Sequence, residues 1–185
     1  MKAFSNILST LCILLCISPL TQAEVLDGVW RIRAFEDEKT IQTRFDFKPK
    51  IMHTGALVLH RYPPMCKRSE LYFELGPAVF DDSLNRDDIT MTFKVDYYPA
   101  RKAKFTGFIQ ARETGDFLVL RMDSLERSST FLAAISAGSN LTIQMSDSAL
   151  HRTWEFPLKG TQKAVEDGYQ GCIRMSHELD GNGTL

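Results

Sequence analysis

Apolar and polar residues alternate in short runs along most of this chain. The clearest run places five apolar side chains on one face of a strand: Ile89, Met91, Phe93, Val95 and Tyr97. Eight similar runs lie at 30–34, 45–47, 57–59, 71–75, 105–109, 118–122, 141–145 and 154–158. Glycines and prolines stand between the runs, where turns are expected. Period-two alternation of this kind predicts β-strands with one buried face.

Two segments in the C-terminal part have helical spacing instead. At 128–138 the apolar residues Phe131, Leu132 and Ile135 follow a serine, and a glycine stands at the expected end. At about 161–174 four apolar residues form one helical stripe: Val165, Tyr169, Cys172 and Ile173. Gly168 lies inside this second helix, at a cost of about 1 kcal/mol relative to alanine, so a close backbone contact is expected there.

Together these elements predict a mainly β fold with some helix. The expected architecture is an antiparallel β-sandwich of about nine strands, with two short helices in its C-terminal part that cover the sheets. A single domain is expected to span 24–175. Residues 176–185 have almost no apolar content and are predicted to form a disordered tail.

Residues 1–23 have the composition of a cleavable secretory signal peptide. Lys2 gives a cationic start, 7–20 is mostly apolar, and Thr21 and Ala23 supply small residues before the cleavage point. The apolar run is too short to cross a bilayer, which takes roughly 20 helical residues. A lipoprotein is the alternative, because Cys16 follows an apolar stretch, but a leucine directly before it fits lipoprotein processing poorly. We therefore expect a periplasmic or secreted protein that is not inserted in a membrane after cleavage.

The length and charge of the mature chain narrow the class of partner. Cleavage after Ala23 leaves 162 of the 185 residues, which is the length of one domain. Lys2 is the only charged residue removed, so 21 Lys+Arg remain against 23 Asp+Glu and the formal net charge is −2. Binding of nucleic acid needs a clearly basic surface, so this balance argues against such a partner.

The mature chain keeps two cysteines, Cys66 and Cys172, because Cys12 and Cys16 leave with the signal peptide. An even pair in an oxidising compartment predicts a disulfide between them. This bond would close a loop of about 100 residues, for which the chain-entropy model gives roughly 4–5 kcal/mol. A metal site or a catalytic thiol is the alternative, although neither cysteine has a second Cys or His at ligand spacing.

One acidic loop is a candidate metal site. Oxygen-bearing side chains alternate at Asp81, Ser83, Asn85 and Asp87, a spacing with which a loop could fold around calcium. The glycine and the terminal glutamate of an EF-hand are missing, so a solvated acidic turn is the alternative. No catalytic residues and no cofactor are predicted, because the four histidines share no ligand spacing and the chain has no GxSxG motif.

A second loop is a candidate binding site. The clearest strand is followed by an aromatic and basic hairpin tip that contains Tyr97, Tyr98, Arg101 and Lys102. Tyrosine and arginine are enriched at the residues that dominate binding energy, and loops on a rigid sheet often carry recognition. The alternative is a basic turn that keeps a sheet edge soluble and prevents pairing with other chains.

The stretch from Phe117 to Cys172 combines a short helix that leads into a strand, a second strand that runs into a glycine turn, and a closing helix that ends in a cysteine. The residues that carry this pattern are Leu132, Ala134, Gly138, Leu141, Ile143, Phe156, Leu158, Gly160, Ala164 and Cys172. The pattern resembles that of small bacterial envelope proteins, namely the type VI secretion-associated VasI-like (TagO-like) family and, more loosely, the invasion-associated locus B proteins. These positions describe a fold and not a site.

The resemblance implies a non-enzymatic periplasmic accessory or binding protein, associated with a secretion system or the cell envelope and acting through a protein partner there. Two alternatives stay open. The first is a periplasmic enzyme inhibitor or immunity-type module that acts through an exposed loop. The second is a hydrolase of envelope material, which would need paired carboxylates or a Ser/His pair in a cleft.

Overall fold

The computed structural model describes residues 24–25, 28–35, 39–48, 54–147 and 149–181. The predicted signal peptide at 1–23 lies outside the described residues. The elements in chain order are β1 (Glu24–Val25), β2 (Gly28–Phe35), β3 (Thr40–Phe47), β4 (Thr54–Arg61), β5 (Glu70–Gly76), the 3₁₀ turn η1 (Asp82–Leu84), β6 (Ile89–Val95), β7 (Arg101–Arg112), β8 (Gly115–Met122), α1 (Leu125–Ala137), β9 (Asn140–Ser146), β10 (His151–Pro157) and α2 (Thr161–Gly181). The predicted mainly β fold, with nine antiparallel strands and two helices in the C-terminal part, is confirmed. Each predicted run overlaps one of the strands β2 to β10, although Tyr97 and Leu158 lie just beyond the ends of β6 and β10.

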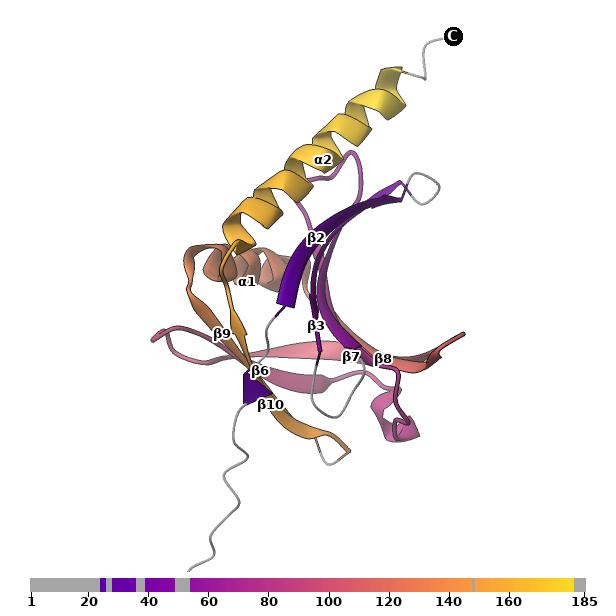
Figure 1. The fold of residues 1–185 in the computed structure, drawn as a ribbon, viewed down its shortest axis with the longest axis vertical. Helices are drawn as coiled ribbons and strands as arrows, with labels where there is room; N and C mark the ends of the chain where they lie inside the picture. The colour runs from indigo at the N-terminus through magenta and orange to yellow at the C-terminus, as the bar shows by residue number, and fades with distance from the viewer. Residues whose placement is uncertain (1–23, 26–27, 36–38, 49–53, 148, 182–185) are drawn as a thin grey trace, which may run out of the picture.

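The layers of the fold belong to one continuous sheet. Its strand order is β1-β10-β9-β6-β7-β8-β5-β4-β3-β2, and all pairings are antiparallel except that of the two-residue strand β1 with β10. The sheet curls until its two ends face each other across the core. Phe45 and Phe47 of β3 thus lie 6.0 and 5.0 Å from Phe156 of β10, measured between ring centroids. In Figure 1 β2, β3 and β8 bow together, and the helices and β9 lie on the convex side of the bow.

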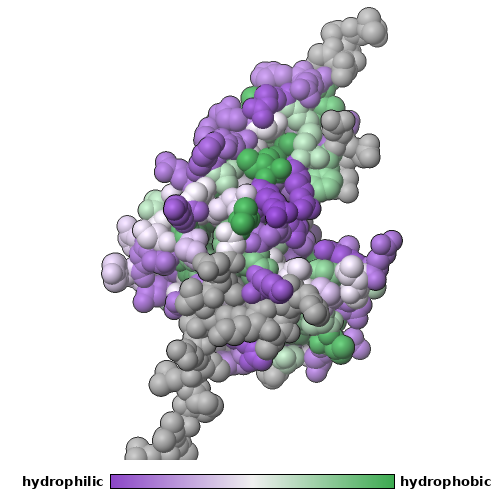
Figure 2. Space-filling view, viewed as in Figure 1, coloured by the Kyte–Doolittle hydropathy of each residue, from purple (hydrophilic) through white to green (hydrophobic). Residues whose placement is uncertain are grey.

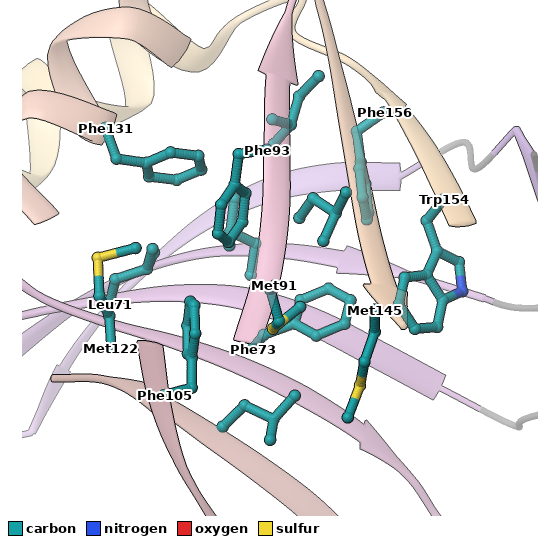
Figure 3. Close-up of a cluster of buried hydrophobic side chains, with 14 of the residues drawn as sticks. Leu71, Phe73, Met91, Phe93, Phe105, Met122, Phe131, Met145, Trp154 and Phe156 are labelled. Atoms are coloured by element: carbon teal, nitrogen blue, oxygen red, sulfur yellow. The ribbon is translucent and has the colours of Figure 1, made fainter. Parts of the chain in front are cut away.

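The hydrophobic core lies between the facing parts of the curled sheet. Every second side chain of a strand points into it. Figure 3 shows Phe73, Met91 and Phe105 converging from different strands, with Trp154 and Phe156 on the facing end of the sheet. These five side chains are fully buried. Burial of one large apolar side chain stabilises the fold by about 1.5–3 kcal/mol, which is why the alternating pattern specifies which face of each strand turns inward.

Helix α1 closes one opening of the curl. The ring of Phe131 packs edge-on against Phe93 at 4.9 Å between centroids, and Ile135 on the next turn is fully buried. The helix ends at Ala137, and the amide of Gly138 donates to the carbonyl of Ala134 (3.0 Å). The prediction of a helix over 128–138 is therefore confirmed, with three more residues at its start.

Helix α2 lies against β2, β3 and β4. Gly168 is the point of closest approach, because a Cβ atom built there would lie 1.9 Å from Oγ1 of Thr43 and 3.0 Å from Nη1 of Arg61. The close contact expected at this glycine is thus confirmed. The Arg61 side chain is buried and donates to Thr43 Oγ1 (3.2 Å), and burial lowers the pKa of its guanidinium although the charge of Glu166 opposes this.

The disulfide between Cys66 and Cys172 is present, with 5.6 Å between the two Cα atoms. It joins the segment between β4 and β5 to the middle of α2, beside a second buried cluster that contains Ile41 and Met175. Helix α2 continues to Gly181 and does not end near residue 174, so the first part of the expected tail, 176–181, is helical. The physical reason is that Leu179 packs against the second cluster and extends the apolar stripe by one turn. Residues 182–185 lie outside the described residues.

Candidate functional site

The turn between β6 and β7, residues 96–100, presents two tyrosines to solvent. We call it the tyrosine turn. Tyr97 is fully exposed and Tyr98 is 69% exposed, although large apolar rings are usually at least half-buried in a folded domain. Within the turn, the amide of Tyr98 donates to the carbonyl of Val95 (3.0 Å). The two rings therefore stand on an ordered backbone.

Asp96 fastens the tyrosine turn to the segment between α1 and β9. Its carboxylate accepts hydrogen bonds from the amides of Ser139 (2.9 and 3.1 Å) and Asn140 (2.8 Å), and its own amide donates to the Asn140 carbonyl (2.9 Å). Its φ of 48° lies in the left-handed region, which aspartate tolerates better than most residues. Beneath it, a Cβ on Gly138 would lie 2.2 Å from Cγ1 of Val95, so only glycine allows the two segments to approach this closely.

The other two residues of the predicted binding site follow at the start of β7. Arg101 and Lys102 are both exposed and pair in register with Phe93 and Thr92 of β6. Successive residues of a strand point to opposite faces, so these two side chains leave the strand on different sides. The structure thus brings Tyr97, Tyr98 and the two basic residues to one end of the sheet.

In the predicted calcium loop, the carboxylates of Asp81 and Asp87 accept hydrogen bonds from within the protein. Asp81 caps η1 by accepting from the amide of Ser83 (2.8 Å), and hydrogen bonds from the side chain and then the amide of Ser83 lower the pKa of its carboxyl. Asn85 ends the same turn, and Asp87 accepts from the hydroxyl of Thr106 (2.9 Å). In the part of the chain that the structure describes, no group of three or more His, Cys, Asp or Glu side chains is placed to hold a metal ion.

A third surface, which the sequence did not single out, is the face of the sheet that points away from the core. We call it the outer face. Strand register places on it Val29, Arg31 and Arg33 of β2, Gln42, Arg44 and Asp46 of β3, Ala56, Val58 and His60 of β4, Glu70, Tyr72 and Glu74 of β5, Val119 and Arg121 of β8, and Thr106 and Phe108 of β7. It forms the concave side of the bow in Figure 1. Ala56, Val58 and Val119 are buried there, beneath the longer side chains around them.

Arg44 is the centre of an ion-pair network on the outer face. Its Nε lies 2.7 Å from Asp46 and its Nη2 lies 3.1 Å from Glu74. Arg112 also approaches Glu74, at 3.6 Å, and stacks on the ring of Phe117. Burial disfavours the charge of Arg44, but the two carboxylates outweigh it and hold the pKa of this guanidinium above its ordinary value. The network therefore fixes long side chains that would otherwise move freely.

Glu70 accepts hydrogen bonds from two tyrosine hydroxyls beside this network. The hydroxyls of Tyr72 and Tyr62 both donate to Oε2 of Glu70, at 2.6 and 3.2 Å. His60 lies 4.7 Å from the ring of Tyr72, between centroids. Burial raises the pKa of Tyr72 strongly, and the hydrogen bond to Glu70 raises it further, so this phenol stays a donor in alkaline solution.

An open hollow of about 500 Å³ adjoins these residues and is lined by Glu70, Asp87, Thr106, Arg121, Met122 and Asp123. We call it the acidic hollow. The Thr106 hydroxyl lies 2.9 Å from both Asp87 and Asp123. A hydroxyl has one proton to donate, so it can satisfy only one of the two carboxylates at a time. The hollow can therefore accept hydrogen bonds from a hydroxyl or an amine of a ligand.

Comparison of the chain with protein-family models, with curated proteins and with solved structures finds no match. The similarity to VasI-like proteins stays a prediction. Among the described helices, none combines the length and the apolar character that crossing a membrane requires.

Proposed function

We propose that this chain is an exported, non-enzymatic accessory protein that binds a protein partner in the bacterial cell envelope. The observation that carries the proposal is the tyrosine turn, where two exposed aromatic rings stand on a backbone fastened by Asp96. The disulfide between Cys66 and Cys172 supports an oxidising compartment, because such bonds seldom persist in the reducing cytosol.

The energetics of association explain why a rigid aromatic turn favours binding. Ordering a flexible side chain at an interface costs about 0.5–1.5 kcal/mol, and the supporting backbone adds to this cost when it is mobile. Tyrosine offers a large contact area with few rotatable bonds. The hydrogen bonds of Asp96 fix the backbone before any partner arrives, so most of the contact energy of Tyr97 and Tyr98 remains available for affinity.

The proposal is tested by cell fractionation followed by recovery of partners from envelope extract with the tagged mature protein. The informative variant is Tyr97→Ala/Tyr98→Ala, and the matched control is Val79→Ala, which shortens another exposed apolar side chain. We expect the wild type and the control to recover the same envelope protein, and the double variant to bind it at least about tenfold more weakly. Equal recovery by all three proteins, or a cytoplasmic location, would contradict the proposal. A soluble enzyme as the partner would favour the inhibitor alternative.

A second candidate function is hydrolysis of envelope material at the acidic hollow. The specific observation is that Asp87 and Asp123 share the Thr106 hydroxyl at the wall of an open hollow. Carboxyl pairs a few ångströms apart are the catalytic groups of most glycosidases. The wild type would then release soluble fragments from purified cell wall, and both Asp87→Asn and Asp123→Asn would abolish the release. If the wild type releases no more than the Asp87→Asn and Asp123→Asn variants do, this candidate is rejected.

A further inference from the structure

The two edges of the sheet differ in length and exposure. One edge is β1, which has two residues, and the other is β2, which has eight. Within the described residues, β2 pairs with β3 on one side and with no strand on the other. An unpaired strand of this length presents a row of backbone donors and acceptors to any extended chain, and natural sheets usually shorten or cover such edges.

The side chains of β2 are divided between its two faces. Val29, Arg31 and Arg33 lie on the outer face, since they pair in register with outer-face residues of β3. Ile32 points to the opposite face. Val29 is 59% exposed and Ile32 is 42% exposed, so apolar surface is available on both sides of the edge. In Figure 2 hydrophobic surface lies over the place that β2 occupies in Figure 1, next to hydrophilic surface.

The two arginines of β2 are available to a ligand. Arg31 is 57% exposed, and its Nε is 3.7 Å from Asp46, whose other oxygen is held by Arg44 at 2.7 Å. Arg33 is exposed and forms no ion pair with any residue that the structure describes. Arg44 itself is occupied by Asp46 and Glu74, so it does not compete for a new anion.

The same arginines disfavour a second copy of the chain as the occupant of this edge. A two-fold antiparallel pairing centred on Ile32 would place Arg31 opposite Arg33. One centred on Arg31 would place the two Arg31 side chains opposite each other. Like charges directly opposite on one face of a sheet are destabilising, whereas opposite charges at the same positions are favourable.

We infer that the free edge of β2 binds an extended acidic segment of a protein partner by strand addition. The segment adds an eleventh strand to the ten-stranded sheet. Its Asp or Glu side chains, at alternate positions, face Arg31 and Arg33, and the apolar residues between them pack beside Ile32. This inference names the partner's chemistry for the proposed binding function and rests on that function. It uses a surface different from the tyrosine turn.

The test uses two synthetic eight-residue peptides, one alternating Glu and Val and one alternating Lys and Val. Each is titrated into the mature, oxidised protein, and the backbone amides are followed by NMR and hydrogen exchange. Trp30 gives a second readout, because it is half-buried on the edge strand 5.2 Å from Phe45, whereas Trp154 is buried in the core. The test variant is Arg31→Glu/Arg33→Glu. The control is Lys94→Glu/Lys102→Glu, which makes the same change of charge at exposed positions of β6 and β7, strands that do not neighbour β2.

The Glu-Val peptide is expected to protect the amides of β2 and to bind at least about tenfold more tightly than the Lys-Val peptide. The Arg31→Glu/Arg33→Glu variant should reverse this order, and the lysine control should keep it. Three results would overturn the inference. The first is no change in the NMR signals or exchange of the β2 amides with millimolar peptide, and the second is equal binding of both peptides. The third is protection of the β2 amides in the free protein together with a molecular mass that rises with concentration, which would show that a second copy occupies the edge. The peptides do not require the tyrosine turn. A negative peptide titration therefore does not affect the result of the pull-down with Tyr97→Ala/Tyr98→Ala, and a negative pull-down does not affect the result of the peptide titration.

Discussion

Replacement of Gly168 by alanine tests the packing of α2 on the sheet. In an unobstructed helix this change stabilises, because alanine has a helix propensity about 1 kcal/mol better than that of glycine. At this position the added Cβ would lie 1.9 Å from Oγ1 of Thr43 and 3.0 Å from Nη1 of Arg61. Neither neighbour can withdraw easily, since Thr43 and Arg61 are both buried on adjacent strands.

The expected magnitude follows from the two ways in which the clash can be relieved. If the helix moves away, loss of close packing costs about 1–3 kcal/mol. If Thr43 rotates instead, the buried guanidinium of Arg61 loses its 3.2 Å hydrogen bond. A buried charged donor without a partner costs about 1.5–3 kcal/mol or more. After the propensity gain of about 1 kcal/mol is subtracted from either cost, we expect Gly168→Ala to lower the free energy of unfolding by about 0.5–2 kcal/mol.

Gly171 provides a matched control three residues further along the same helix. A Cβ there would meet its nearest neighbours, Ile41 and Arg174, at 3.8 Å or more, which is ordinary van der Waals contact. Gly171→Ala is therefore expected to raise the free energy of unfolding by about 1 kcal/mol. Urea unfolding of the oxidised proteins, followed by tryptophan fluorescence, measures both values. The reasoning is refuted if Gly168→Ala is as stable as the wild type, or if both variants change stability in the same direction.

Three further predictions address other parts of the fold. The variant Cys66→Ala/Cys172→Ala should lose about 3–5 kcal/mol in the same urea assay, because the bridge joins residues separated by 106 positions; an unchanged midpoint would contradict this. Asp96→Ala should cost about 1–2 kcal/mol and speed hydrogen exchange at the amides of Ser139 and Asn140, which lose their acceptor; unchanged exchange at these amides would show that Asp96 does not fasten the turn. The pKa of Tyr72 is raised above its ordinary value of 10.0 in the folded protein, so the unfolded chain releases this proton first as the pH rises. The contribution of Tyr72 to stability is therefore fully present below pH 10 and is lost as the pH rises further. The stability of Tyr72→Phe should therefore fall less steeply than that of the wild type above pH 10, and equal slopes in urea midpoints against pH would count against a shifted pKa.

The strands could be predicted from the sequence because alternation is a local property. In β6 the alternation of apolar and polar residues from Ile89 to Val95 predicts which side chains face the core, because every second one is buried. The order of the strands in the sheet is not local. Pairing of β5 with β8 and of β6 with β9 joins segments that are far apart in the chain, and no spacing of residues encodes these neighbours. The closure of one sheet on itself depends on the same long-range pairings.

The outer face shows why a site can escape sequence analysis. Arg44 of β3 and Glu74 of β5 occupy polar positions, and each alone is typical of a solvent-exposed strand face. They form an ion pair only because β3, β4 and β5 are neighbours in the sheet. One local pattern could have indicated this surface: β4 contains the apolar run from Ala56 to Leu59, which is the pattern of a strand buried on both faces.

The extent of α2 was missed for a different reason. The polar composition of 176–181 favours a tail, and a count of apolar residues gives little weight to Leu179. Its position decides the outcome, because it lies four residues after Met175 and so continues the stripe that packs beside the disulfide.

The most direct test of partner binding through the tyrosine turn is photo-cross-linking in intact cells. A photoreactive phenylalanine derivative is placed at Tyr97 in one strain and at Val79, which is also fully exposed, in another. We predict one defined cross-linked envelope protein from position 97 and none from position 79. No product at position 97, or the same products at both positions, would contradict the proposed function.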